Sequence, residues 1–217
     1  MRKNERRQAL SALSAGKKKA KKSGPPTKAT GGFGKKVVAA AAPAPKEVQP
    51  SVARRELGED RPCPCHLRGS TYGDCCKPYL EGDTVVPDAE WLLRSRYSAF
   101  SLANADYIVD TTHRTHSDYD EDRAEWKERV LGGLDELRFV DLDIKKSAPL
   151  EAPAGFEAAH RIHFSCGICV PAPGGGAKRA QRSTVTEIST FLKEDGRWYY
   201  SGGVVNPSPD AWDDGSS

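Results

Sequence analysis

The sequence predicts an α+β domain in which helices come first and an antiparallel sheet follows, preceded by a cysteine-rich loop. Apolar residues recur at helical spacing between residues 88 and 131, and from Arg138 onward they alternate with polar residues. Helices that precede strands favour packing of the helices onto one face of an antiparallel sheet. Four cysteines lie within fourteen residues just before the first helix. This density indicates a loop that its thiols hold together.

The basic charge of the chain is concentrated at its start. Residues 1–50 carry thirteen Lys or Arg and two Glu, a balance of +11; because the whole chain carries +3, residues 51–217 sum to −8. This segment has few large apolar residues and cannot bury enough surface to offset its ordering entropy. We expect residues 1–60 to be a disordered basic tail, or alternatively a transit segment. Apart from Phe33 the tail lacks aromatic residues for base stacking, so no specific nucleic-acid readout is expected.

The distribution of apolar residues and cysteines indicates the cellular compartment of the protein. No stretch approaches the roughly 20 apolar residues that a membrane helix needs, and no secretory-type apolar core follows the first charges. Six cysteines in such a chain are typical of metal ligands or core thiols rather than of a disulfide framework. We expect an intracellular, reducing compartment: the cytoplasm, or the plastid stroma if the tail is a transit segment.

The four clustered cysteines predict a metal site. Two cysteines separated by one residue, then nine residues, then two adjacent cysteines give four thiolates that a glycine-containing loop can fold around one ion. Four sulfur ligands select zinc over hard cations, and a closed shell leaves no position for a reacting water. We therefore predict a structural zinc site formed by Cys63, Cys65, Cys75 and Cys76, with His66 as an alternative to Cys75 or Cys76.

Three helices are expected after this loop. Asp88 is a good N-cap for a helix over 88–100 that carries Leu92, Leu93, Ala99 and Phe100 near one face. A shorter helix is expected over 104–112 and a third over about 120–131.

Alternating apolar residues predict the strands that follow. One strand contains Phe139, Leu142 and Ile144, and in the next Ile162, Phe164 and Cys166 alternate with polar residues. A loop is expected at 171–177, return strands over 183–192 and 197–200 around an Asp195-Gly196 turn, and a polar C-terminal tail over 207–217.

Several short blocks carry a family resemblance. Cys63-Pro-Cys65 with Tyr72-Gly-Asp-Cys75-Cys76 resembles the SEC-C zinc-binding motif. Lys77-Pro-Tyr-Leu, Leu93-Arg-Ser-Arg-Tyr-Ser-Ala-Phe, Ala105-Asp-Tyr and Phe191-Leu-Lys-Glu-Asp-Gly-Arg-Trp-Tyr-Tyr resemble the YchJ-like family (UPF0225), in the family's order. The resemblance covers about Pro62 to Gly203.

This resemblance implies a zinc knuckle over residues 61–82 followed by an NTF2-like cone over 86–206, in which helices are wrapped by a strongly curved, mainly antiparallel sheet around a pocket. Two features depart from the family. The loop between the cysteine pairs has nine residues where eight are usual, and no second SEC-C motif follows Tyr200.

Several residues outside the knuckle are candidates for a pocket in the cone: Arg96, Tyr97, His113 and His163. A catalytic pair would need a histidine held by a carboxylate, and Asp106 or Asp110 could serve His113. A buried Arg96 would need a carboxylate partner, for which Asp106, Asp141 and Asp143 are candidates.

A second cysteine pair, Cys166 and Cys169, has redox or metal-site spacing, but residues three apart in a strand face opposite sides. We interpret these two cysteines as small core or rim residues.

Together these features predict a zinc-binding, non-enzymatic module that binds a protein through the knuckle or a small molecule in the cone. The alternative is an NTF2-like enzyme, of isomerase or lyase type, with a histidine and carboxylate pair in the pocket. The sequence leaves the partner, the ligand and the oligomeric state open.

Overall fold

Four antiparallel strands form one curved sheet in the computed structural model, which describes residues 54–134, 137–170 and 181–212. Strands β1 (Arg138–Leu150), β2 (Ala158–Val170), β3 (Gln181–Glu194) and β4 (Arg197–Val205) pair in the order β1-β2-β3-β4. The predicted tail as far as residue 53 and the predicted loop at 171–177 lie outside the described residues. The end of that predicted tail, residues 54–60, instead lies against the domain, where Arg55 N donates to Leu102 O at 2.8 Å. The α+β prediction is confirmed, with strands that extend beyond the predicted cores.

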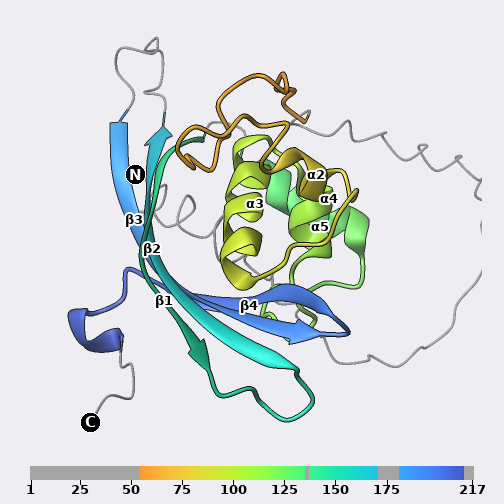
Figure 1. Cartoon of the computed structure of the whole chain (residues 1–217), viewed down its shortest axis with the longest axis vertical. Helices are drawn as coiled ribbons and strands as arrows, with labels where there is room; N and C mark the ends of the chain where they lie inside the picture. Colours follow the sequence, from red (N-terminus) through yellow and green to blue (C-terminus); the bar gives the residue numbers. More distant parts are fainter. Residues whose placement is uncertain (1–53, 135–136, 171–180, 213–217) are drawn as a thin grey trace, which may run out of the picture.

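The helices lie together on one side of this sheet (Figure 1). They are α2 (Lys77–Leu80), α3 (Ala89–Ser101), α4 (Ala105–Asp110) and α5 (Arg123–Gly132). Each of the last three begins at a side-chain cap, as expected for Asp and Asn at this position. The Asp88 carboxylate accepts a hydrogen bond from Trp91 N at 2.8 Å, and Asn104 and Asp122 cap α4 and α5.

Helix α2 is a difference from the sequence prediction, which places only loop structure between the cysteines and Asp88. Its four residues begin after Cys76 and include Pro78 in the first turn. Proline is well tolerated there because its missing N–H has no partner in a helix start. Leu80 is the buried residue of this turn and joins the core.

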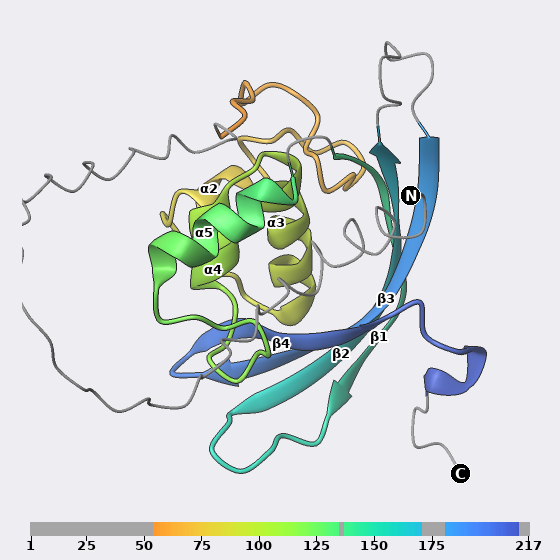
Figure 2. The same cartoon turned by 180° about the vertical axis from the view of Figure 1, so that it is seen from behind.

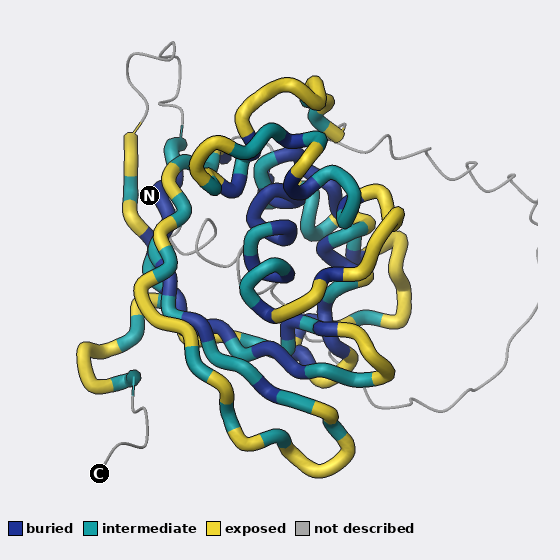
Figure 3. The backbone as a smooth tube through the Cα atoms, in the orientation of Figure 1, coloured by how far each residue is buried: buried dark blue, intermediate teal, exposed yellow. Residues whose placement is uncertain are grey.

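The sheet curves around α3, which is the most enclosed element (Figure 3). Nine of its thirteen residues are buried, and they include Leu92, Ala99 and Phe100. Irregular register between Val140 and Leu142, between Ile144 and Lys146, and opposite Thr190 marks three bulges, which bend and twist a sheet locally. Because of this curvature, the two outer strands of the sheet, β1 and β4, both contact the same helix.

After β4 the chain crosses to the side of the sheet that the helices do not cover. Residues 206–212, which include the 3-10 turn η2 (Pro209–Ala211), lie on the face of the sheet opposite to the helices (Figure 2). Two layers therefore become three at this point: helices, sheet and C-terminal segment. Among the described residues, no helix is long and apolar enough to cross a membrane.

Candidate functional sites

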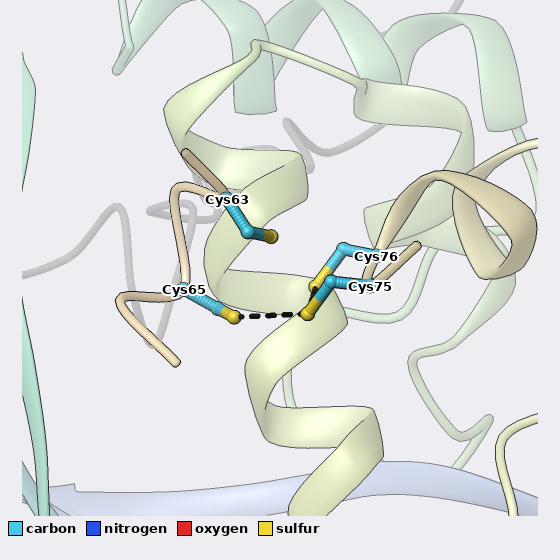
Figure 4. A group of neighbouring side chains, drawn as sticks. All are labelled: Cys63, Cys65, Cys75 and Cys76. Atoms are coloured by element: carbon cyan, nitrogen blue, oxygen red, sulfur yellow. Dashed lines mark hydrogen bonds between the residues drawn. The ribbon is translucent and has the colours of Figure 1, made fainter. Parts of the chain in front are cut away.

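The four predicted ligands converge at the start of the domain (Figure 4). Their sulfur atoms lie within 4.8 Å of one another, and all four side chains are buried. The Sγ atoms of Cys65 and Cys75 are 3.5 Å apart, and those of Cys75 and Cys76 are 3.8 Å apart. A tetrahedron with zinc–sulfur bonds of about 2.3 Å has edges of about 3.8 Å, so the spacing fits a zinc ion.

The electrostatics of the cluster also fit a cation. Hydrogen bonds from the neighbouring thiols lower the pKa of Cys63, whereas the same proximity and burial raise the pKa values of Cys75 and Cys76. Against the opposing effect of Cys63, hydrogen bonds from Cys75 and Cys76 also lower the pKa of Cys65. Ionisation of Cys63 and Cys65 is thus favoured and that of Cys75 and Cys76 is opposed. Only a cation among the sulfurs would allow all four to be thiolates, and zinc supplies that charge when it is bound.

A short hairpin and one helical turn present the thiols to the same point. Pro62 and Thr71 pair across the hairpin, and Cys63 N donates to Ser70 O at 3.1 Å. Gly69 takes a positive φ of 74° at the turn, which glycine adopts without strain. Cys75 and Cys76 follow immediately before α2.

The knuckle is anchored on the domain rather than attached by a linker. The Ser98 Oγ of α3 lies 3.7 Å from Cys63 Sγ, where its hydroxyl can donate to a thiolate. His66, the alternative ligand, instead accepts a hydrogen bond from Asp141 N at 3.1 Å and contacts the ring of Tyr97. The cluster is made of cysteines alone, and His66 fixes the loop to β1.

Comparison with known proteins decides the family. Residues 88–203, just over half of the chain, match the family model of the YchJ middle NTF2-like domain. The chain belongs to the YchJ family. The four-cysteine cluster that precedes the matched residues is consistent with a SEC-C zinc site.

Two solved structures of SEC-C motif containing proteins are similar to this YchJ-family chain. The solution structure from Rhodopseudomonas palustris is 30% identical, with a TM-score of 0.48, over 64% of this chain and 94% of that one. The crystal structure from Psychrobacter arcticus is 25% identical, with a TM-score of 0.49, over 69% of this chain and 85% of the other.

An acid is buried between the helices and the sheet of this YchJ-family domain. Glu187 of β3 faces the helices with Val185, Ser189 and Phe191, is 2% exposed, and accepts hydrogen bonds from Tyr200 Oη at 2.9 Å and Ser189 Oγ at 2.6 Å. Its Oε2 has no hydrogen-bond partner among the described residues. Burial raises its pKa, against the effect of the hydrogen bonds and of Arg96.

The backbone is shaped around this carboxyl group. A Cβ atom added at Gly203 of β4, opposite Ser189, would lie 2.3 Å from Glu187 Oε1 and 2.9 Å from Tyr200 Oη. Any larger residue at this position would therefore displace the carboxyl group. The sequence prediction missed Glu187, although the alternation Val185, Glu187, Ser189 and Phe191 places it on the core-facing side.

Arg96 is the buried arginine that the sequence predicts, but its partners differ from the expected ones. Its guanidinium donates to Ile108 O at 2.9 Å and to the hydroxyls of Thr111 and Thr112, and it lies 4.7 Å from the centre of the Tyr200 ring. Burial lowers its pKa to about 10. We call Glu187, Ser189, Tyr200 and Arg96 the interior cluster.

The carboxylates proposed for Arg96 and His113 are engaged elsewhere. Asp106 pairs with Lys127 at the protein surface, Asp110 with Arg123, Asp141 with Arg182 and Asp143 with Lys145. The prediction that one of them is the partner of Arg96 is therefore wrong. Arg94, two residues earlier on α3, pairs with Glu90 at 2.9 Å and remains partly exposed.

His113 does have a carboxylate partner, but not an expected one. Its Nε2 lies 3.2 Å from Glu194 Oε2, and Arg114 contacts both oxygens of the same carboxylate. Arg114 and His113 lower the pKa of Glu194 to about 2. Glu194 faces away from the interior cluster because it lies seven positions, an odd number, after Glu187 on β3, whose pairing with β2 has no bulge. The pair holds the β3–β4 hairpin against residues 113–114 rather than lining the cone.

The other candidates divide between the two faces of the sheet. Tyr97 lies inside, packed on Phe139, and its hydroxyl has no partner among the described residues. His163 lies on the opposite, outer face, beside the C-terminal segment. Cys166 is a core residue, 1% exposed, and burial raises its pKa to about 12; Cys169 is partly exposed. All six cysteines are free of disulfides.

Proposed function

We propose that this YchJ-family protein is a zinc-binding, non-enzymatic interaction module whose knuckle docks another protein. The observation that carries this proposal is the closed set of four buried thiols at tetrahedral spacing. A zinc ion held by four cysteines has no open position for substrate or water, so its role is structural.

The zinc would give the knuckle one fixed shape on the domain. Contacts of Cys63 with Ser98 and of His66 with the Asp141 backbone tie the first part of the loop to α3 and β1. A loop ordered in this way loses little conformational entropy when it binds a partner.

The docking surface in this proposal is the outer side of the hairpin. Arg61, His66, Arg68 and Gly69 are exposed there, around the partly buried Leu67. A rim of cationic and polar side chains around an apolar residue resembles a small protein-binding surface.

Two measurements test the two parts of this proposal. Metal analysis of the purified full chain under reducing conditions should give about one equivalent of zinc, and the Cys75→Ser, Cys76→Ser variant should bind far less. Less than about half an equivalent, with the four thiols freely titratable, would remove the metal part of the proposal.

The docking part needs a variant that keeps the metal. Arg68→Glu changes only the exposed loop and should lose the partner in a pull-down while retaining zinc. Arg197→Glu on the β3–β4 hairpin makes the same charge change at another exposed arginine and should behave as wild type. Identical partners for wild type and Arg68→Glu would contradict docking through this surface.

The interior cluster favours a second candidate, an enzyme of isomerase or lyase type. A carboxylic acid with a raised pKa beside hydroxyl donors is an arrangement used for proton transfer. Glu187 would replace His113 as the reacting acid in this hypothesis. Any activity found in a turnover screen of the wild type should then be lost in Glu187→Gln. If the variant is as active as the wild type, Glu187 is not the reacting acid.

A further inference from the structure

A cavity lies on the outer face of the sheet, on the side away from the helices. It has a volume of about 350 Å³, is open to solvent on one side, and is lined by residues of β2, β3 and the C-terminal segment. This volume falls in the range of small-molecule sites, about 300–1,000 Å³. Neither the knuckle nor the interior cluster contributes to it, because Glu187 and Ser189 point to the other face.

The wall that the C-terminal segment contributes is held firmly in place. Asn206 adopts a positive φ of 49° and turns the chain back; its N–H donates to Thr186 O at 2.7 Å, and its Oδ1 accepts from Thr186 N at 3.3 Å. Pro207 and Pro209 restrict the segment that follows. The cavity wall is therefore preorganised, although the sequence alone indicates only a polar tail.

Trp212 lines the cavity at the far end of this segment. Its indole stacks on the His163 ring, with centroids 6.0 Å apart and planes at 25°. The Arg161 guanidinium lies 4.4 Å from the centre of the indole, and the Lys146 ammonium 5.7 Å. In the sheet register Lys146, His163 and Ile188 form one row across β1, β2 and β3. Positive charge thus gathers at the edge of the cavity, around an aromatic wall.

The lining combines flat apolar surface with a few polar atoms. Ile188, Pro207, Pro209 and Trp212 supply the apolar part, while Thr186, Asn206 and Ser208 add polar groups. His163 Nε2 is buried and has no hydrogen-bond partner among the described residues. Burial and the neighbouring lysines lower the pKa of His163, so its ring is neutral at pH 7 and one nitrogen can donate.

We propose that this cavity binds a small aromatic carboxylate, with the ring between Trp212 and the prolines and the carboxylate near His163 and Lys146. Each part of the ligand has a matching group: apolar walls for a planar ring, a buried histidine nitrogen without a partner, and cations at the edge. A neutral aromatic compound would leave the cations unused, and a simple anion would leave the apolar walls uncovered.

A nuclear magnetic resonance titration of the full chain with benzoate tests this proposal. The indole N–H signal of Trp212, assigned by its loss in Trp212→Phe, should shift and saturate with a Kd of about 1 mM or tighter. Benzyl alcohol, which lacks the charge, and acetate, which lacks the ring, should each bind at least about tenfold more weakly. No saturable shift up to about 10 mM benzoate, or equal shifts with all three compounds, would overturn the proposal.

Two variants assign the site, and one controls for the surface. His163→Phe keeps a ring against Trp212 but removes the donor, and should weaken benzoate binding about tenfold. Lys146→Ala, at an exposed position, should weaken it several-fold without affecting folding. Val204→Ala, also exposed on the sheet but outside the cavity lining, should leave it unchanged. Unchanged binding in both His163→Phe and Lys146→Ala would place benzoate elsewhere.

Discussion

The cysteine cluster and the interior cluster are both buried and polar, yet they are built in opposite ways. The cysteine cluster takes its four groups from fourteen residues of one loop, and its sulfurs have mainly one another as neighbours. The interior cluster takes its groups from α3, β3 and β4, and its carboxyl and guanidinium groups bond to neutral hydroxyls and a carbonyl. The four thiols need an added cation before all of them can ionise. The carboxyl and guanidinium groups of the interior cluster instead find almost all of their partners within the protein.

The two clusters should therefore lose stability for different reasons. A loop with little core of its own depends on its metal, as small metal-supported domains do. A cluster embedded in a sheet depends on the shape of the backbone around it, because close-packed interiors leave little room for change.

Zinc removal should produce the largest effect. A strong chelator under reducing conditions should cost about 5 kcal/mol or more of unfolding free energy, since metal binding energy is folding energy for the knuckle. Thermal unfolding followed by circular dichroism measures it. Cys169→Ser, a thiol outside the cluster, should cost less than about 1 kcal/mol. The same unfolding curve before and after complete loss of zinc would show that the knuckle does not depend on its metal.

Crowding of the interior acid should have the next largest effect. Gly203→Ala places a methyl group against the Glu187 carboxyl and should destabilise the protein by about 2–3 kcal/mol in denaturant unfolding. Gly132→Ala, at the end of α5, meets nothing within 4 Å and should be neutral or slightly stabilising. If both variants unfold at the same denaturant concentration, the carboxyl group does not occupy the position described.

The protonation of Glu187 should make the stability of the protein depend on pH. Because its pKa is raised in the folded protein, the stability contributed by the neutral acid is complete below about pH 4.5 and is lost as the pH rises toward the folded value. Glu187→Gln stays neutral, so its stability relative to wild type should increase with pH by up to about 1.4 kcal/mol per unit above 4.5. Urea unfolding at several pH values measures this difference, and a difference independent of pH would contradict it.

The smallest expected effect concerns the contact between the knuckle and α3. Ser98→Ala removes the hydroxyl beside Cys63 and should weaken zinc binding about tenfold in a competition titration with a chromophoric chelator. Ser101→Ala, whose hydroxyl bonds to Tyr97 O in the same helix, should leave zinc affinity unchanged. Equal affinities for the two variants would mean that Ser98 does not support the metal centre.

The sequence by itself predicts the features that depend only on residues close together along the chain. Four cysteines in one short loop predict a metal site because thiols so close together in the sequence can meet without any long-range packing. Asp88 marks the start of α3 because a cap acts within its own first turn, and the change from helical to alternating spacing at Arg138 gives the fold class.

The tertiary structure alone decided which distant groups meet. Glu194 rather than Asp110 faces His113, since residues 81 positions apart become adjacent only when the β3–β4 hairpin folds against residues 113–114. The alternation in β2 already places His163 on the face opposite to Ile162 and Phe164, but only the tertiary structure brings the C-terminal segment beside it to form the outer cavity. Trp212 reaches that same face only because Asn206 reverses the chain. Pairings of this kind depend on the packing of the whole domain, and local spacing carries no information about them.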